Sequence, residues 1–395
     1  MQYLSSVLLV VYLGWMKYVL HPLAYGLFWW RNGPIRRRAA ADTTPKQQHV
    51  LVILESNGNG RFTQANNLLQ MERFVPNGAI VTMAWDLSQR PVSDTTIEPE
   101  SVHQIIHLAT PVMRFDPQTG GVSALSILCS EILDVRSMLS YLDSWYHLVN
   151  YLHDHQVTSV INLFSTSAGV CSRIVPIDVP VYNIATQYIH LDLDSGHLHP
   201  RGQQCPPHLL LTLDMLVNLT RAVSPRGTHT LSIVPSPREG PTCISFPAPP
   251  WIEHIPTGCE TPLSHSFVLV YTLNTYQSTR VFEVASQLAG TSFVYFSPLL
   301  PKPHHPNNVC LRPVHREAFL WYLQQPGAVV WTTGGYMLPC EAISMGRQCL
   351  LTPTLGHLEQ QMNATYFQTH FPLQVRSCDP GTDETALLRT LLHTR

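Results

Sequence analysis

The chain has 395 residues, of which 45% are hydrophobic and only 13% are charged, and its formal net charge is −2. Average soluble domains carry about 25% charged residues, so this composition indicates a folded protein with much buried or membrane-facing surface, not a disordered one. The low net charge gives no electrostatic basis for nucleic-acid binding, which usually needs a concentrated basic face. The length favours two domains over a single core.

Residues 1–38 are predicted to attach the chain to a membrane. The sequence from Tyr3 to Trp30 is nearly all apolar, broken by Lys17 and by His21-Pro22, and a bilayer span needs about 20 such residues. One tilted span and a re-entrant or interfacial element are both open; a cleaved signal peptide is disfavoured because no Lys or Arg precedes the run. Arginines after the run predict a body that faces the cytosol, and nine cysteines without a C-x-x-C pair favour reduced thiols.

Residues 45–240 are predicted to form one α/β domain. Apolar runs of strand length alternate with helical patterns, and a Gly-rich turn follows the first run, as in the βα unit of a doubly wound sheet. Strands are predicted at His49–Leu54, Ala79–Met83, Gln104–Leu108, Thr158–Phe164, Val179–Ile184 and Thr228–Val234, and helices at Ala65–Phe74, Glu131–His155 and Pro207–Ala222.

Residues 241–262 are rich in proline, which favours an extended connector. The alternation restarts in residues 263–395 and predicts a second α/β domain, whose last helix is expected to pack back across the connector. Two such domains are typical of an enzyme with its site in the cleft between them. Strands are predicted at Ser266–Thr272, Thr291–Phe296, Val309–Arg312, Ala328–Thr332 and Gln348–Leu351, and helices at Thr279–Leu288, His315–Gln324, Tyr336–Met345, Leu358–His370 and Asp383–His393.

The most informative segment is the turn Gly334-Gly335 between a predicted strand and a predicted helix. Glycine lets backbone amides approach an anion, and the helix N-terminus adds a partial positive charge, which suits a diphosphate. Glu341, about a turn and a half into the helix, is expected on a solvent-accessible face, where its carboxylate accepts hydrogen bonds from ribose hydroxyls.

The loop after the next predicted strand presents side chains with the donors and acceptors that sugar hydroxyls require. Both loops follow neighbouring parallel strands, and ligands gather at the carboxyl ends of such strands in open α/β sheets. The two loops are therefore expected to form one site. The second loop contributes His357, Glu359, Gln360 and Gln361.

Residues 328–364 resemble the donor-site signature of the MurG-like glycosyltransferases. They are most similar to a bacterial and archaeal branch with G-G-x-x-x-x-x-E followed by P-x-x-G-x-x-E-Q-x-x-N-A, and the resemblance is good over about residues 266–370. It implies the two-domain α/β fold called GT-B, with Gly334 and Gly335 facing the diphosphate and Glu341 the ribose. Glu359, Gln360 and Gln361 would then meet the sugar.

The resemblance also implies the activity. The expected reaction is metal-independent transfer of a sugar, with inversion, from a nucleoside diphosphate, commonly UDP, to a hydroxyl of a membrane-associated, lipid-linked or glycan acceptor. The first Gly-rich turn, with Gly58, Gly60 and Arg61, resembles the family's acceptor-side loop. The histidine that many relatives carry there is absent, so the general base is left open among Asp86, Asp116, Glu131 and Asp134.

No metal ion and no cofactor are predicted. Asp192-Leu-Asp194 fits neither a calcium loop nor the needs of this architecture, and His153-Asp-His155 lacks a second ligand pair. Three other functions stay open: a sugar-nucleotide epimerase, a non-catalytic membrane subunit that recruits a transferase, and a sugar-binding relative without activity. A pure scaffold would have no use for Glu341 and Gln360 together.

Overall fold

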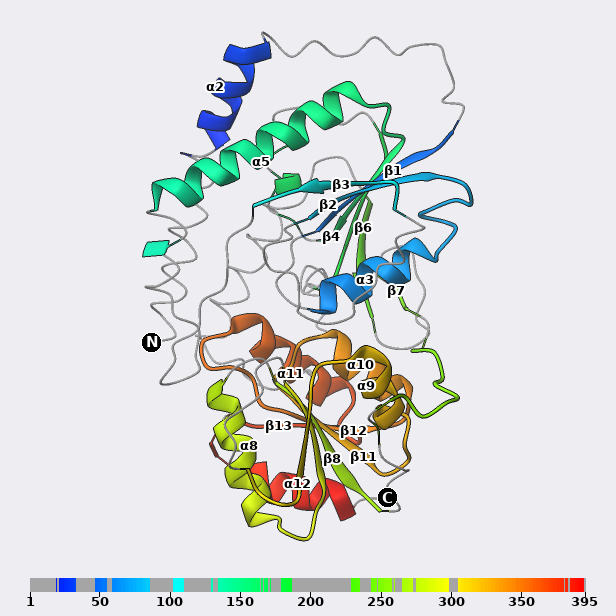
Figure 1. Cartoon of the computed structure of the whole chain (residues 1–395), viewed down its shortest axis with the longest axis vertical. Coiled ribbons are helices and arrows are strands. Elements are labelled where there is room, and N and C mark those ends of the chain that lie inside the picture. The colour runs from blue at the N-terminus through cyan, green and yellow to red at the C-terminus, as the bar shows by residue number, and fades with distance from the viewer. Residues whose placement is uncertain are drawn as a thin grey trace.

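The computed structural model of the chain contains two parallel sheets, each covered by helices, stacked along the long axis of the molecule (Figure 1). This confirms the predicted fold class of two Rossmann-like α/β domains. The structure describes residues 19, 21–32, 47–54, 59–85, 102–109, 129–130, 134–163, 165, 167–169, 171, 179–186, 229–234, 243–246, 248–257, 259, 265–272, 275–297, 305–379, 381–382 and 384–393.

The N-terminal sheet has the strand order β3-β2-β1-β4-β5-β6-β7, and every pair is parallel. Its central strands are apolar runs, as expected for strands buried on both faces. The last strand lies within the proline-rich segment 241–262. The strands are β1 (His49–Leu54), β2 (Ile80–Trp85), β3 (Gln104–His107), β4 (Ser159–Leu163), β5 (Val181–Ala185), β6 (His229–Ile233) and β7 (Cys243–Ile244).

Helices α3 (Asn59–Leu69) and α5 (Val135–Asp154) cover opposite faces of this sheet. Alternate residues of β1 enter two separate cores, because successive strand side chains point to opposite faces. Val52 packs in the core that includes Leu68 of α3, whereas Ile53 packs in the core that includes Trp145 of α5. The first helix begins earlier than its predicted start at Ala65, since the weak helix formers Asn and Gly in its first turn conceal that turn.

The C-terminal sheet has the order β10-β9-β8-β11-β12-β13 and is also parallel throughout. In both sheets the chain reverses its direction of travel beside the first strand, between β1 and β4 and between β8 and β11, and such switch points are where ligands bind. The strands are β8 (Phe267–Tyr271), β9 (Phe293–Phe296), β10 (Val309–Arg312), β11 (Ala328–Thr332), β12 (Gln348–Leu351) and β13 (Val375–Ser377).

The five helices of this domain are α8 (Thr275–Gln287), α9 (Arg316–Leu323), α10 (Met337–Ser344), α11 (Leu358–His370) and α12 (Glu384–His393). The last helix packs on the C-terminal sheet beside α8 instead of crossing the connector. Its Leu388 and Leu391 are buried in the core that also contains Val268 and Val329. The amphipathic face of α12 thus completes the cover of its own sheet.

Residues 248–257 of the connector lie against the C-terminal domain. Gln324, the buried C-cap residue of α9, forms a reciprocal pair of hydrogen bonds with the backbone of Ile252. The Ile252 amide donates to Gln324 Oε1 at 2.9 Å, and Gln324 Nε2 donates to the Ile252 carbonyl at 2.7 Å. The connector is therefore held by one side chain that satisfies two backbone groups.

The carboxyl edges of the two sheets face each other. Helix α3 follows the carboxyl end of β1, α10 follows the carboxyl end of β11, and these two helices contact each other (Figure 1). The switch point of each sheet consequently opens toward the other domain.

Near the N-terminus, helix α2 (His21–Asn32) lies against α5. None of the helices that the structure describes is long and apolar enough to cross a bilayer. The predicted span from Tyr3 to Trp30 is therefore not seen as one helix in the described residues; α2 has 12 residues, and residues 1–18 lie outside the description. The cysteines that the structure describes are all free thiols.

Candidate functional site

The turn after β11 is held tightly to helix α11. Gly334 has φ 85°, a left-handed conformation that favours glycine, and a Cβ built on it would lie 3.1 Å from the Gln360 carbonyl oxygen. Asn363 Nδ2 donates to the Gly334 carbonyl at 3.1 Å, and Asn363 is buried. Gln360 and Asn363 thus fix the turn from the side of α11, so this part of the predicted motif serves to shape the loop.

Gly335 is exposed, and no described atom lies within 4 Å of a Cβ built on it. Helix α10 begins two residues later. Its N-cap residue is Tyr336, whose side chain makes no capping hydrogen bond to the described part of the helix. The first backbone N–H groups of a helix have no intrahelical partner and carry partial positive charge. The turn therefore presents open space in front of an end that favours an anion.

Glu341 lies on α10, but it is buried instead of solvent-accessible. Its side chain is 8% exposed, and both oxygens accept hydrogen bonds from Arg316, the first residue of α9: Nη1 to Oε2 at 2.9 Å and Nη2 to Oε1 at 2.5 Å. The predicted exposed face for Glu341 is wrong, because the carboxylate is buried and paired with Arg316 of α9. Sequence reasoning missed Arg316, which lies 25 residues away and carries no motif.

The loop after β12 is ordered by a second set of contacts. Gln360 is buried, and its side-chain oxygen accepts from the Thr354 amide at 2.8 Å, while the Thr354 hydroxyl accepts from Gln277 of α8 at 3.1 Å. Gly356 has φ 75° and allows the chain to turn into α11. Gln360 consequently has its side-chain nitrogen and one lone pair of its side-chain oxygen left to meet a ligand.

His357 is the N-cap of α11, and its Nδ1 accepts a hydrogen bond from the backbone N–H of Gln360 at 3.5 Å. Burial lowers the pKa of His357, and this outweighs the opposing charge of Glu359. Because Nδ1 accepts, the neutral ring carries its proton on Nε2, which is a hydrogen-bond donor. Glu359 and Gln361 are half-buried, and the four predicted residues are the N-cap and part of the first turn of α11.

In the N-terminal domain, the predicted loop is described only in part. Gly58 lies outside the described residues, Gly60 is in the first turn of α3, and the backbone of Arg61 belongs to α3 while its side chain is not described. Gln64 on α3 is 3% exposed, and its side-chain oxygen has no hydrogen-bond partner in the described part of the chain. An unpaired buried acceptor costs about 1–3 kcal/mol, so it calls for a donor from outside the described residues.

Asn162 of β4 and Asn183 of β5 form a buried polar pair. Because apolar residues surround them, the sequence pattern predicts both strands as apolar runs. Asn162 Nδ2 donates to Asn183 Oδ1 at 2.7 Å, and the Ser165 amide donates to Asn162 Oδ1 at 2.9 Å. This network orients the chain where it leaves β4. Asp134, one of the predicted candidates for the base, is the N-cap of α5 and accepts from the Ser137 amide at 2.9 Å; the other three candidates lie outside the described residues.

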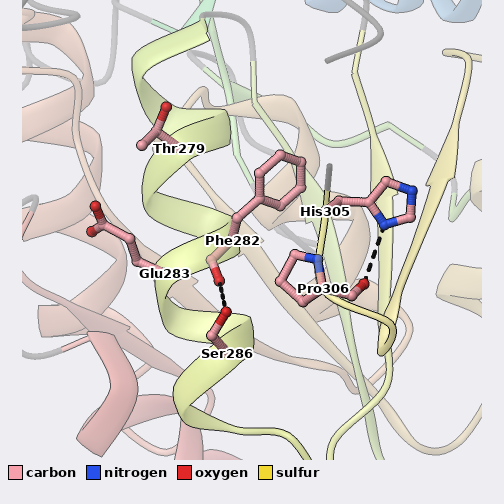
Figure 2. Close-up of a pocket in the computed structure, with 6 residues that line it drawn as sticks. All are labelled: Thr279, Phe282, Glu283, Ser286, His305 and Pro306. Atoms are coloured by element: carbon pink, nitrogen blue, oxygen red, sulfur yellow. Dashed lines mark hydrogen bonds between the residues drawn. The ribbon is translucent and has the colours of Figure 1, made fainter. Parts of the chain in front are cut away.

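A pocket of about 460 Å³ lies between α8 and the segment of His305 and Pro306 (Figure 2). It is formed by residues in the later turns of the helix and by the segment that precedes β10, so it lies toward the amino ends of the strands. The candidate site occupies the opposite edge. Glu283 in the pocket is paired with Arg280 at 2.8 Å. The pocket is lined by Thr279, Phe282, Glu283, Ser286, His305 and Pro306.

Comparison with known proteins shows the fold. No protein-family model and no curated protein matches the sequence. Among solved structures, the glycotransferase of kitacinnamycin aligns with a TM-score of 0.53 at 17% identity, over 88% of this chain and 90% of that one. Phytolacca americana UGT2, complexed with UDP-2fluoro-glucose and pterostilbene, gives 0.54 at 14% identity, over 89% and 91% of the chains.

The spinosyn rhamnosyltransferase SpnG, complexed with thymidine diphosphate, aligns with a TM-score of 0.52 at 14% identity, over 87% of this chain and 92% of that one. These neighbours do not single out a MurG-like branch. They share with this chain two parallel-sheet domains over most of its length. The chain therefore has the GT-B fold of these glycosyltransferases.

Proposed function

We propose that the chain is a glycosyltransferase of the MurG-like type that uses a nucleoside-diphosphate sugar, by resemblance a UDP-linked one. The observation that carries this proposal is the exposed Gly335 in front of the start of α10, with Glu341 further along the same helix. A diphosphate and the ribose attached to it need these two features in this order. The neighbours complexed with UDP-2fluoro-glucose and with thymidine diphosphate support a nucleotide ligand for this fold.

The donor would extend from α10 to the start of α11. Backbone amides at Gly334 and Gly335 would face the diphosphate, and Glu341 would accept from the ribose. Near the sugar, His357 offers its Nε2 proton. Glu359, Gln360 and Gln361 supply the remaining donors and acceptors, and the Gln360 oxygen keeps one lone pair beside the bond that it accepts from Thr354.

In the proposed reaction, an acceptor hydroxyl oxygen attacks the anomeric carbon while the bond from that carbon to the diphosphate oxygen breaks. The electron pair of the broken bond leaves with the diphosphate, whose growing charge would be stabilised by amides at the start of α10 without a metal ion. The hydroxyl proton goes to a base on the N-terminal side. Attack opposite the leaving group gives inversion.

The acceptor would bind on the N-terminal domain, close to α3. Gly58, Gly60 and Arg61 begin this segment, and the unpaired oxygen of Gln64 lies on the same helix, which contacts α10 of the donor domain. A hydroxyl or amide of the acceptor would satisfy that oxygen. This assignment gives each domain one substrate.

The test is titration of the full chain with UDP and TDP, followed by incubation with a panel of UDP-, TDP- and GDP-sugars. We expect one diphosphate to bind and its sugar nucleotide to be hydrolysed or used for transfer. Gly335→Val should weaken that diphosphate at least about tenfold, which is about 1.4 kcal/mol, because a side chain would fill the open space before α10.

Gly290→Val is the matched control, since Gly290 is also exposed with no described atom within 4 Å of a built Cβ. It should bind like the parent. If no diphosphate binds, or if Gly335→Val binds like the parent, the proposal is wrong. Conversion of the sugar without release of nucleotide would instead support the epimerase.

We also propose that the N-terminal segment binds a membrane surface and that the body faces the cytosol. Helices α2 and α5 contact each other, and large apolar side chains are exposed on α2 and in the first turns of α5. Tryptophan and tyrosine favour the membrane–water interface. The arginines Arg31, Arg36, Arg37 and Arg38 follow in the sequence and would favour anionic lipid headgroups. The exposed apolar residues are Leu23, Tyr25, Leu27, Trp29, Trp30, Val135 and Leu139.

A further inference from the structure

The ion pair between Arg316 and Glu341 joins two helices at the carboxyl edge of the C-terminal sheet. Arg316 opens α9 soon after β10 ends at Arg312, and Glu341 lies on α10, which follows β11. Tyr271, the last residue of β8, contacts Phe319 of α9 edge to face with ring centres 6.0 Å apart. The pair therefore lies beside the switch point between β8 and β11.

The geometry of the pair leaves part of the carboxylate free. A carboxylate has about four lone-pair positions, two on each oxygen, and the guanidinium uses one on each, through Nη1 and Nη2. One lone pair per oxygen remains, on the side of that oxygen turned away from the guanidinium. The 2′-hydroxyl of a ribose can donate to one of these lone pairs, whereas a 2′-deoxyribose lacks that donor.

The Glu341 carboxylate also needs Arg316 to stay charged and in this orientation. The Glu341 side chain is 8% exposed and the Arg316 side chain 34%, so without the guanidinium the carboxylate would be buried without a partner charge. A buried unpaired carboxylate takes up a proton or turns away. The planar fork of arginine fixes the plane of the carboxylate as well as its charge, which a lysine ammonium does not.

From this geometry we infer that Arg316 is a positioning residue that makes the donor site select ribonucleoside over 2′-deoxyribonucleoside diphosphates. The inference rests on the proposed function and deepens it by naming the sugar of the nucleotide. SpnG, which shares the fold, is complexed with thymidine diphosphate, whose sugar lacks the 2′-hydroxyl, so the fold alone does not determine this preference.

The experiment is calorimetric titration of the full chain with UDP and with 2′-deoxy-UDP, repeated with the guanosine and adenosine pairs. We expect the ribonucleotide of the recognised base to bind at least about tenfold more tightly than its 2′-deoxy form, the effect of one hydrogen bond to a charged group. Arg316→Gln should weaken the ribonucleotide and bring the ratio close to one, with little change for the deoxy form. Arg316→Lys should keep part of the ratio.

Arg347→Gln is the matched control. Arg347 is also a partly buried arginine of this domain, but it donates to the backbone carbonyls of Leu323, Gln324 and Pro326 and so supports structure alone. Its loss should lower the melting temperature and leave the ratio unchanged. If Arg316→Gln unfolds, Arg316→Lys and Glu341→Gln are titrated in its place. The inference then requires that the ratio of ribonucleotide to deoxyribonucleotide affinity falls in these variants.

The outcomes separate the two proposals. A parent chain that binds no diphosphate of either kind overturns the proposed function. A parent that binds both sugars equally, or a ratio that survives in Arg316→Gln or, if that variant unfolds, in both other variants, overturns the role of Arg316 and leaves the proposed function standing. An equal loss for both sugars in Arg316→Gln would show a structural role alone, and it also overturns the inference.

Discussion

At the scale of single residues, His49 shows how a polar side chain is accommodated at the amino edge of the N-terminal sheet. Its Nε2 lies 3.0 Å from the Thr82 hydroxyl and 3.1 Å from the Tyr151 hydroxyl, and those two hydroxyls are 2.8 Å apart. His155 stacks on Tyr151 with ring centres 3.9 Å apart. Burial lowers the pKa of His49 below its usual 6.5, and the nearby His155 and His103 lower it further.

Because the pKa of His49 is lowered in the folded state, the imidazole of the unfolded chain takes up its proton at a higher pH than that of the folded chain. Stability should therefore fall as the pH drops below about 6.5 and level off below the folded pKa. We expect His49→Gln to lose less melting temperature than the parent between pH 7 and pH 5. His147→Gln, at an exposed histidine on α5, should follow the parent; a His49→Gln curve parallel to the parent would contradict this role.

At the scale of elements, α8 and α12 are joined by a buried ion pair. Glu384, the first residue of α12, accepts from Arg280 Nη2 at 2.8 Å and from the Gly381 amide at 2.6 Å. Burial raises the pKa of Glu384, but hydrogen bonds from Arg280 and Gly381 outweigh it, so the pKa lies below the usual 4.5. The carboxylate thus fixes the start of α12 to α8.

We expect Glu384→Gln to lower the free energy of unfolding by about 1–3 kcal/mol, because it removes a charged hydrogen-bond acceptor from a buried position. Because the folded pKa is lowered, this contribution is present above about pH 4.5 and is lost as the pH falls through the folded value. Urea unfolding at pH 7 and at pH 3.5 should show the difference shrink. Glu283→Gln, which removes an exposed partner of the same arginine, should cost less than about 0.5 kcal/mol.

At the scale of the whole molecule, the apolar surface of α2 and α5 lies on the N-terminal domain, at the far end from the C-terminal domain (Figure 1). Membrane contact through that surface would leave the donor side free. Trp29 and Trp30 are 53% and 77% exposed there, whereas Trp251 in the connector is 67% exposed and lies elsewhere. Trp251 is therefore a control for Trp29 and Trp30, since it is similarly exposed but lies away from the proposed membrane surface.

In vesicles that contain anionic lipid, brominated acyl chains should quench the tryptophan fluorescence of the full chain. We expect the quenched fraction to fall in the variant with Trp29→Phe and Trp30→Phe and to stay unchanged in Trp251→Phe, because bromine quenches only rings at the depth of the lipid. Equal quenching in all three proteins would show that α2 does not contact the bilayer. Protease protection in sealed vesicles tests the cytosolic orientation separately.

The sequence by itself determined the alternation of elements and the position of the two loops of the candidate site. β1, β10, β11, β12 and α11 have the predicted bounds, because buried runs and turn residues are local signals that specify one element at a time. The sequence pattern did not predict the short edge strands β7 and β13, because such strands are stable only when they pair with a neighbour.

Only the tertiary structure decided what surrounds the candidate site. The fold gives Glu341 of α10 an arginine partner on α9 from 25 residues away, and it brings α3 of one domain into contact with α10 of the other. Such pairs leave no periodic trace in the sequence, because the distance along the chain does not fix the distance in space. A buried charge in a chain with few charges requires a partner, but the fold selects which one.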